Sequence, residues 1–155
     1  MGKTRVLVDV QGKPPRGHKK FVAWCGENVL KLMELPYNCE LSVLLTDDKI
    51  MRELNLDHRG IDSTTDVLSF AMNEGAKIAS PPSRNYILLG DVVISINCAI
   101  KQAQEQQHPL KKELALLIAH GILHLLGYDD ATDDGFREME NLGKELVEKI
   151  DLETI

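Results

Sequence analysis

The sequence predicts an α+β fold, with a small mixed sheet of about four strands packed against about five helices. Two observations lead to this class. Stretches rich in strand-forming residues alternate with stretches of helical period, in the order β-α-β-α-β-β-α-α-α. One helical stretch near the C-terminus is apolar nearly all round, which predicts a central helix, and its two histidines predict a zinc-protease-like site.

The first strand and helix are indicated by composition and period. Residues 5–10 (RVLVDV) alternate in part and are typical of a strand. The loop at 12–17 contains enough proline and glycine to exclude regular structure. Residues 18–35 have a helical period that Pro36 should end, with apolar side chains at 21, 22, 25, 29, 32 and 33.

A second strand is expected at residues 40–45, which are rich in β-formers. Thr46 is the expected N-cap of a short helix that ends near Leu56, because its hydroxyl can accept a hydrogen bond from the first turn. Asp47 and Asp48 would then lie in that turn, where the helix dipole favours negative charge.

Two more strands are predicted at residues 66–72 (DVLSFAM) and 86–94 (YILLGDVVI). The loop that joins them, 73–85, is too long for a tight hairpin and is expected to form the rim of a groove. Ser95 is suited to cap a helix that runs to about Gln107.

The last two helices include the central one. Pro109 suits the first position of a helix that runs to Leu126. A final amphipathic helix is indicated by apolar residues at helical spacing, namely Phe136, Met139, Leu142, Leu146 and Ile150.

Composition indicates an ordinary globular protein. Its 155 residues, 43% of them hydrophobic, suffice for one domain (1–155) with a substantial core. No apolar run approaches a membrane span, and the first twenty residues lack a signal-peptide core, so we expect a cytoplasmic protein with no membrane contact. Cys25, Cys39 and Cys98 are odd in number and widely spaced, which favours buried free thiols in a reducing compartment.

The net charge of −6 is unfavourable for a simple nucleic-acid binder, but the charges are unevenly distributed. The first twenty residues contain six basic residues and one acidic, whereas the chain from 129 onward contains ten acidic and three basic. This polarity would let one face hold RNA, although two solvated ends explain it equally well.

The spacing His120-x3-His124-x2-Gly127-x2-Asp130 predicts a metal centre. Residues four apart lie on one face of a helix, so both imidazoles can reach one ion. Gly127 can adopt the left-handed conformation that ends a helix, which would let the chain return Asp130 to the same ion. Two nitrogens and one oxygen leave the fourth position of a tetrahedral Zn²⁺ open, as in catalytic sites.

Other ligands and other uses of this motif remain open. Asp129, Asp133 and Asp134 are nearby, but the last two suit the first turn of the final helix. His108 is a fallback ligand whose simpler role is a helix cap. The spacing matches metzincin proteases, but Gly121 occupies the position of their general-base glutamate.

Two further classes share this ligand set. Two histidines and a carboxylate also form the facial triad of non-haem iron oxygenases. A zinc that only holds the last helix in place would make the protein a non-catalytic, ribosome-associated module, although structural zinc normally has four protein ligands.

Three motifs in the same order resemble the YbeY family of bacterial endoribonucleases. They are HGILHLLGYDD at 120–130, HRGIDSTTDVLSF at 58–70 and LGDV at 89–92, and the likeness spans nearly the whole chain. The resemblance implies a zinc-dependent endoribonuclease for single-stranded RNA. It also implies a role at the small ribosomal subunit, in 3′-end maturation of ribosomal RNA and ribosome quality control.

The resemblance also implies site residues. The family motif ends in histidine where this chain has Asp130, so here the third ligand becomes a carboxylate. Arg59 corresponds to an arginine important for activity in that family, and a guanidinium suits the role because it binds phosphate oxygens in pairs. We therefore count Arg59 and His120 as catalytic, with a surface salt bridge from Arg59 to Asp62 or Asp66 as the alternative.

Overall fold

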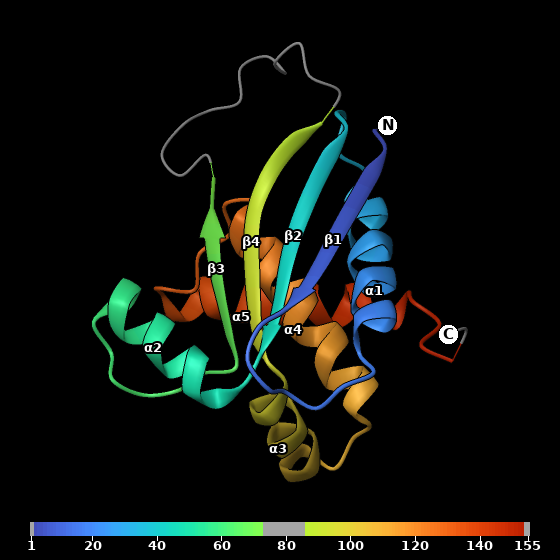
Figure 1. The fold of residues 1–155 in the computed structure, drawn as a ribbon. Coiled ribbons are helices and arrows are strands. Elements are labelled where there is room, and N and C mark those ends of the chain that lie inside the picture. Colours follow the sequence, from blue (N-terminus) through green and yellow to red (C-terminus); the bar gives the residue numbers. More distant parts are fainter. Residues whose placement is uncertain (1, 73–85, 154–155) are drawn as a thin grey trace.

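The sheet has four strands in the spatial order β1-β2-β4-β3 in the computed structural model, which describes residues 2–72 and 86–153 (Figure 1). β1 runs parallel to β2, and β2 parallel to β4, whereas β3 is antiparallel to β4. The sheet is therefore mixed, as predicted. Its strands are β1 (Thr4–Val10), β2 (Cys39–Thr46), β3 (Val67–Ala71) and β4 (Ile87–Ser95).

Five helices complete the described part of the chain, and the α+β class is confirmed. None of the helices in the described ranges is long and apolar enough to span a bilayer. The predicted loop at 73–85 lies outside the described residues. The helices are α1 (Lys19–Leu32), α2 (Asp48–Arg59), α3 (Ile96–Gln106), α4 (Leu110–Leu125) and α5 (Asp133–Glu148).

One face of the sheet carries the main core. α1 and α4 pack against this face, and α5 packs against α4, so α4 is enclosed as the sequence predicted (Figure 1). β2 shows the period expected for a strand that is buried on one face. Its alternate residues Cys39, Leu41, Val43 and Leu45 all enter this core.

A smaller core attaches α2 to the opposite face of the sheet. Met51 of α2 is fully buried against Leu68 of β3 and Val93 of β4. The Asp48 carboxylate accepts hydrogen bonds from Ser95 Oγ at 2.6 Å and Thr64 Oγ1 at 3.1 Å. These contacts hold the segment between α2 and β3 against the start of α3.

The N-cap of α2 differs from the prediction. Thr46 is the last residue of β2, and its buried hydroxyl donates to the Gln11 carbonyl at 2.8 Å, so it cannot serve the helix. Asp47 takes that role instead, because its Oδ1 accepts from the Ile50 N–H at 3.0 Å. The helix also continues beyond Leu56 to Arg59.

Other boundaries shift slightly. α1 ends at Leu32 rather than at residue 35, because Glu34 adopts a φ of +51° and turns the chain before Pro36. Ser95 caps α3 as predicted, accepting from the Cys98 N–H at 3.1 Å. Pro109 directly precedes α4 rather than occupying its first position.

The three cysteines are all free. Cys25 and Cys39 are buried as expected, whereas Cys98 is only half-buried. Burial raises the pKa of the Cys25 thiol to about 12, which keeps it protonated and inert.

Candidate metal centre

The last turns of α4 bring His120 and His124 together. Their ring centroids are 4.8 Å apart at an interplanar angle of 78°. Both side chains are about 70% removed from solvent, with 28% and 30% of their surface exposed. Apolar side chains of α4 pack in the core, while the two imidazole rings remain partly exposed. The distance between the rings is therefore set by the packed helix and not by a loop.

The C-terminal end of α4 is closed by a Schellman motif around Gly127. The Gly127 N–H donates to the His124 carbonyl at 3.1 Å, and the Tyr128 N–H donates to the Leu123 carbonyl at 3.0 Å. This motif requires a left-handed residue, and Gly127 has a φ of +101°. The chain therefore reverses immediately after the second histidine.

The reversal returns Asp130 to the two imidazoles. Asp130 Oδ2 lies 3.4 Å from His124 Nε2 and 3.9 Å from His120 Nε2. One ligand atom from each of the three residues lies within 4.8 Å of the others. Tetrahedral Zn²⁺ with bonds of about 2.0–2.1 Å separates its ligand atoms by about 3.4 Å, so this donor set fits the ion with small side-chain adjustments.

The neighbouring aspartates lie outside the candidate metal group. Asp129 Oδ1 accepts from the Ala131 N–H at 2.9 Å and so shapes the loop. Asp133 and Asp134 lie exposed in the first turn of α5, behind the Thr132 N-cap. Of these four carboxylates, the structure brings only Asp130 to the histidines.

The electrostatics of the centre favour a neutral His120. Burial, followed by the nearby His124, lowers the pKa of His120 below its ordinary value, and Asp130, Asp66 and Glu140 only partly oppose this. A neutral imidazole is the form that binds a metal. The site therefore presents this nitrogen for binding near neutral pH.

Gly121 occupies the position of the protease general base, and it faces the sheet. A β-carbon there would lie 2.7 Å and 2.9 Å from the two methyl groups of Val92. Its carbonyl accepts from Ser69 Oγ at 3.3 Å. A glutamate at this position would be driven into β4, so the described residues offer no metzincin-like general base beside His120.

A groove of about 770 Å³ extends from the centre between α3, α4 and α5. His120, Asp130 and Phe136 line it near the metal centre, and His108 and Glu113 line it as well. Phe136, one of the apolar residues that predicted the last helix, is not buried: 46% of its surface is exposed. Periodicity could not reveal this, because it identifies the apolar face of α5 but not which part of that face the neighbouring elements cover.

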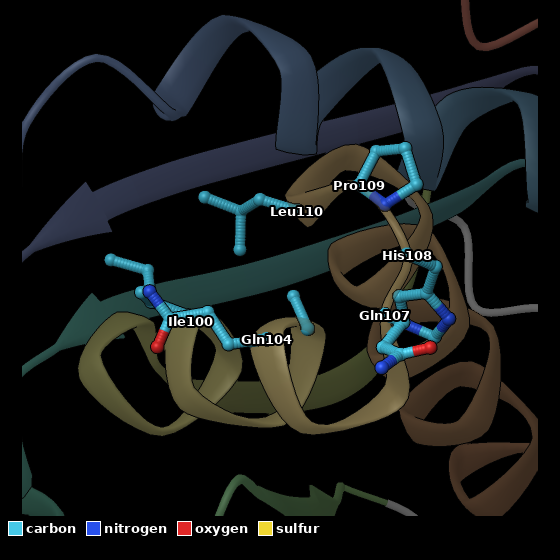
Figure 2. Close-up of a pocket in the computed structure, with 7 residues that line it drawn as sticks. Ile100, Gln104, Gln107, His108, Pro109 and Leu110 are labelled. Carbon is cyan, nitrogen blue, oxygen red and sulfur yellow. The ribbon is translucent and has the colours of Figure 1, made fainter.

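His108 is not brought to the other histidines. Its Nε2 lies 3.1 Å from the Glu113 carboxylate, in a part-buried pair at the turn between α3 and α4. Figure 2 shows His108 there, beside a separate cavity of about 370 Å³ bordered by Ile100, Gln104 and Leu110. The fallback ligand therefore lies outside the candidate metal group.

Arg59 lies at the C-terminal end of α2, exposed, and does not line the groove. The neighbouring His58 ring packs against Phe70 in a tilted arrangement, with 4.8 Å between centroids and 55° between the ring planes, which holds this end of α2 against β3. Asp62 pairs with Arg52 at 2.7 Å rather than with Arg59. Asp66 Oδ1 accepts from the Val67 N–H. The alternative role of Arg59, a salt bridge to Asp62 or Asp66, is not formed among the described residues.

The fold and the site together define an α+β protein with two histidines and an aspartate converging at the end of its central helix. The chain belongs to the endoribonuclease YbeY family, because the family model described as Endoribonuclease YbeY matches residues 10–151. The resemblance that the three sequence motifs indicated is confirmed.

Similar proteins agree with this placement. Proteins named Endoribonuclease YbeY are 44% identical over 147 residues in Persephonella marina and 45% identical over 143 residues in Aquifex aeolicus. The first match covers 94% of this chain and 92% of the Persephonella marina protein. The second covers 90% of this chain and 89% of the Aquifex aeolicus protein. The solution structure of a Thermotoga maritima protein matches with a TM-score of 0.62 at 27% identity, covering 94% of this chain and 87% of the other.

Proposed function

We propose that this protein is a zinc-dependent endoribonuclease that cleaves single-stranded RNA. The observation that carries the proposal is the convergence of His120, His124 and Asp130 beside a groove, in a chain of the endoribonuclease YbeY family. We infer that its substrate is ribosomal RNA on the small ribosomal subunit. Its task is 3′-end maturation and ribosome quality control in the cytoplasm, carried out by residues 1–155 as one domain.

His120, His124 and Asp130 would hold one Zn²⁺ through Nε2, Nε2 and a carboxylate oxygen. A zinc held there would supply a Lewis acid for a phosphate oxygen or for a water molecule. Three protein ligands leave a position open for that chemistry, whereas a purely structural zinc would need a fourth protein ligand, and the candidate group in the described chain has three. This donor count supports a catalytic role over a non-catalytic ribosome-binding module.

Arg59 would bind the phosphate of the substrate. It has no hydrogen bond or ion pair within the described ranges, unlike Arg52 on the same helix, which pairs with Asp62. A guanidinium without an internal partner can donate two parallel hydrogen bonds to phosphate oxygens and offset the charge that develops there. Packing of His58 on Phe70 would position the helix end that carries it.

The position of Gly121 weighs against a zinc metalloprotease-like hydrolase. Peptide hydrolysis needs a base that takes a proton from water and returns it to the amine, and Gly121 has no side chain to do so. An RNA substrate carries its own 2′-hydroxyl as a potential nucleophile, so the same centre can serve RNA cleavage without that glutamate.

The experiment measures metal content and cleavage of a labelled single-stranded oligoribonucleotide, with a peptide substrate as the protease control. We expect one zinc per chain, and loss of cleavage after chelation or in His120→Ala. Arg59→Ala should reduce cleavage at least tenfold with zinc content unchanged, while the matched variant Arg52→Ala stays active.

Cleavage that survives both chelation and His120→Ala would overturn the proposal, as would peptide hydrolysis in place of RNA cleavage. Stoichiometric iron with oxygen-dependent turnover would instead indicate the facial-triad class. For the cellular role, loss of the protein should cause 3′-extended small-subunit ribosomal RNA to accumulate.

A further inference from the structure

We propose that Phe136 forms a nucleobase subsite beside the metal centre, where a base of the single-stranded substrate stacks on its ring. This inference rests on the proposed endoribonuclease function and adds a residue that would determine specificity. Phe136 is apolar and aromatic, yet its side chain is exposed at the edge of the groove.

Phe136 lies on the same face of α5 as the residues that this helix buries, but Phe136 itself is not buried. Along that stripe, Met139, Leu146 and Val147 are buried, with at most 5% of their surface exposed, whereas 46% of Phe136 is exposed. At this end of α5 the ring borders the groove beside His120 and Asp130 instead of the core.

Local capping does not account for the ring either. With Thr132 as N-cap, Phe136 occupies the position that often packs against the residue just before the cap. That residue is Ala131, which is itself exposed and whose methyl group is too small to cover a phenyl ring. The aromatic face therefore stays available to a ligand.

The ring shares the groove with the metal ligands. Phe136 lines the same cavity as His120 and Asp130, from the loop and helix end that follow α4. A nucleotide whose phosphate reaches the centre could thus place a neighbouring base against Phe136. Such stacking tolerates any base, since every base has a π-face.

Charge favours a base rather than a phosphate at this place. Besides Asp130, which would ligate the metal, the groove lining has five acidic residues and two lysines, and the acids include Asp66 and Glu140. Phosphates are repelled from such walls, whereas a neutral base is not. The substrate would therefore place a base against Phe136, while a bound metal would offset the acidic charge for the one phosphate that reaches it.

This arrangement also gives a physical basis for selecting single strands. Bases within a duplex are paired and stacked on one another, and only an unpaired base can turn out onto an aromatic side chain. A paired strand would leave Phe136 uncovered and lose the stacking contribution.

The test measures binding of a fluorescent single-stranded oligoribonucleotide to the chelated protein, and KM and kcat of the zinc-loaded protein. Phe136→Ala and Phe136→Leu should each weaken binding and raise KM by about tenfold, the loss typical of one stacked base. kcat and zinc content should stay the same. Phe136→Trp should bind the oligonucleotide as tightly as the unaltered protein. Leu7→Ala is the control, since Leu7 of β1 is a similarly exposed apolar residue, and it should have no effect.

Abasic substitution along the oligonucleotide sharpens the test. One position near the cleaved bond should show a loss of about tenfold with the unaltered protein and none with Phe136→Ala. If Phe136→Ala and Phe136→Leu both bind RNA with wild-type affinity, the subsite is overturned but the proposed function is not. The same holds if Phe136→Leu binds RNA as tightly as Phe136→Trp. RNA that the unaltered protein neither binds nor cleaves overturns the proposed function and the subsite with it.

Discussion

Gly121 of α4 lies so close to Val92 of β4 that an added β-carbon would stand 2.7 Å from a valine methyl group. The contact lies one residue after His120, and Ser69 Oγ donates to the Gly121 carbonyl from the neighbouring strand at 3.3 Å. Close packing and this hydrogen bond seat the histidine helix on the sheet.

The first prediction concerns this contact. Gly121→Ala should lower the free energy of unfolding by about 1–3 kcal/mol, because Val92 is fully buried and cannot move away. Gly143→Ala in α5 is the matched control. Its β-carbon would meet nothing within 4 Å, so the better helix propensity of alanine should stabilise by about 0.5–1 kcal/mol. Urea unfolding measures both, and equal effects of the two substitutions would contradict the close contact.

The second prediction separates Asp130 from its neighbour. Zinc at a hundredfold excess over its Kd should stabilise the unaltered protein by about 2.7 kcal/mol. Asp130→Asn should weaken zinc binding at least tenfold and reduce that gain. Asp129→Asn should not, because its side chain shapes the loop through the Ala131 N–H and an amide oxygen can still accept that bond. Thermal unfolding of each variant at increasing zinc concentration measures the zinc affinity. Equal zinc affinity in the two variants would show that Asp130 is not a zinc ligand.

A third prediction follows from the charge of the carboxylate ligand. Asp130→His restores a neutral third ligand and makes the loaded site more positive by one charge. A more positive site lowers the pKa of the water that it activates, so the pH–rate profile should shift to lower pH while activity is kept. Single-turnover cleavage across the pH range measures the shift, and an unchanged profile would argue against direct ligation by Asp130.

The fourth prediction uses the lowered pKa of His120 in metal-free protein. Burial first, then His124, holds that pKa below the ordinary value of 6.5, while Asp130, Asp66 and Glu140 raise it only in part. As pH falls below 6.5, the unfolded chain binds a proton that the folded state resists, so stability decreases until the folded ring also protonates. Unfolding with chelator between pH 8 and 5 should show this loss, and His120→Gln should reduce it. Identical pH dependence in the two proteins would contradict it.

The convergence of His120, His124 and Asp130 could be predicted from the sequence because its geometry is local. His120 and His124 depend only on helical spacing, and Gly127 on a turn that returns Asp130 within a few residues. The exposure of Phe136 could not be read from periodicity, because it depends on which part of the apolar face of α5 is covered, and that is a property of tertiary packing.

The N-cap of α2 was misassigned for a related reason. Thr46 and Asp47 are both good caps, and only the tertiary hydrogen bond from Thr46 to Gln11 determines which of them is free to act. The four-strand sheet itself followed from the alternation of strand and helix patterns, because those patterns reflect burial on one face. The register between strands needed the structure.

The last prediction tests this cap. Asp47 accepts from the Ile50 N–H at 3.0 Å and from the Lys13 N–H at 2.8 Å, so it caps α2 and also anchors the loop that follows β1. These backbone donors, Ile50 first, hold the pKa of Asp47 below its ordinary value of 3.8. Asp47→Ala should therefore cost about 1–2 kcal/mol at neutral pH. The cost should be fully present above the unfolded-state pKa of Asp47 and should shrink as pH falls through its folded-state pKa.

Asp47→Asn is the control variant, since it keeps an acceptor for the Ile50 N–H and should lose less stability at pH 7 than Asp47→Ala. Urea unfolding at pH 7 and near pH 3 measures whether the stability difference between Asp47→Ala and the unaltered protein becomes smaller in acid.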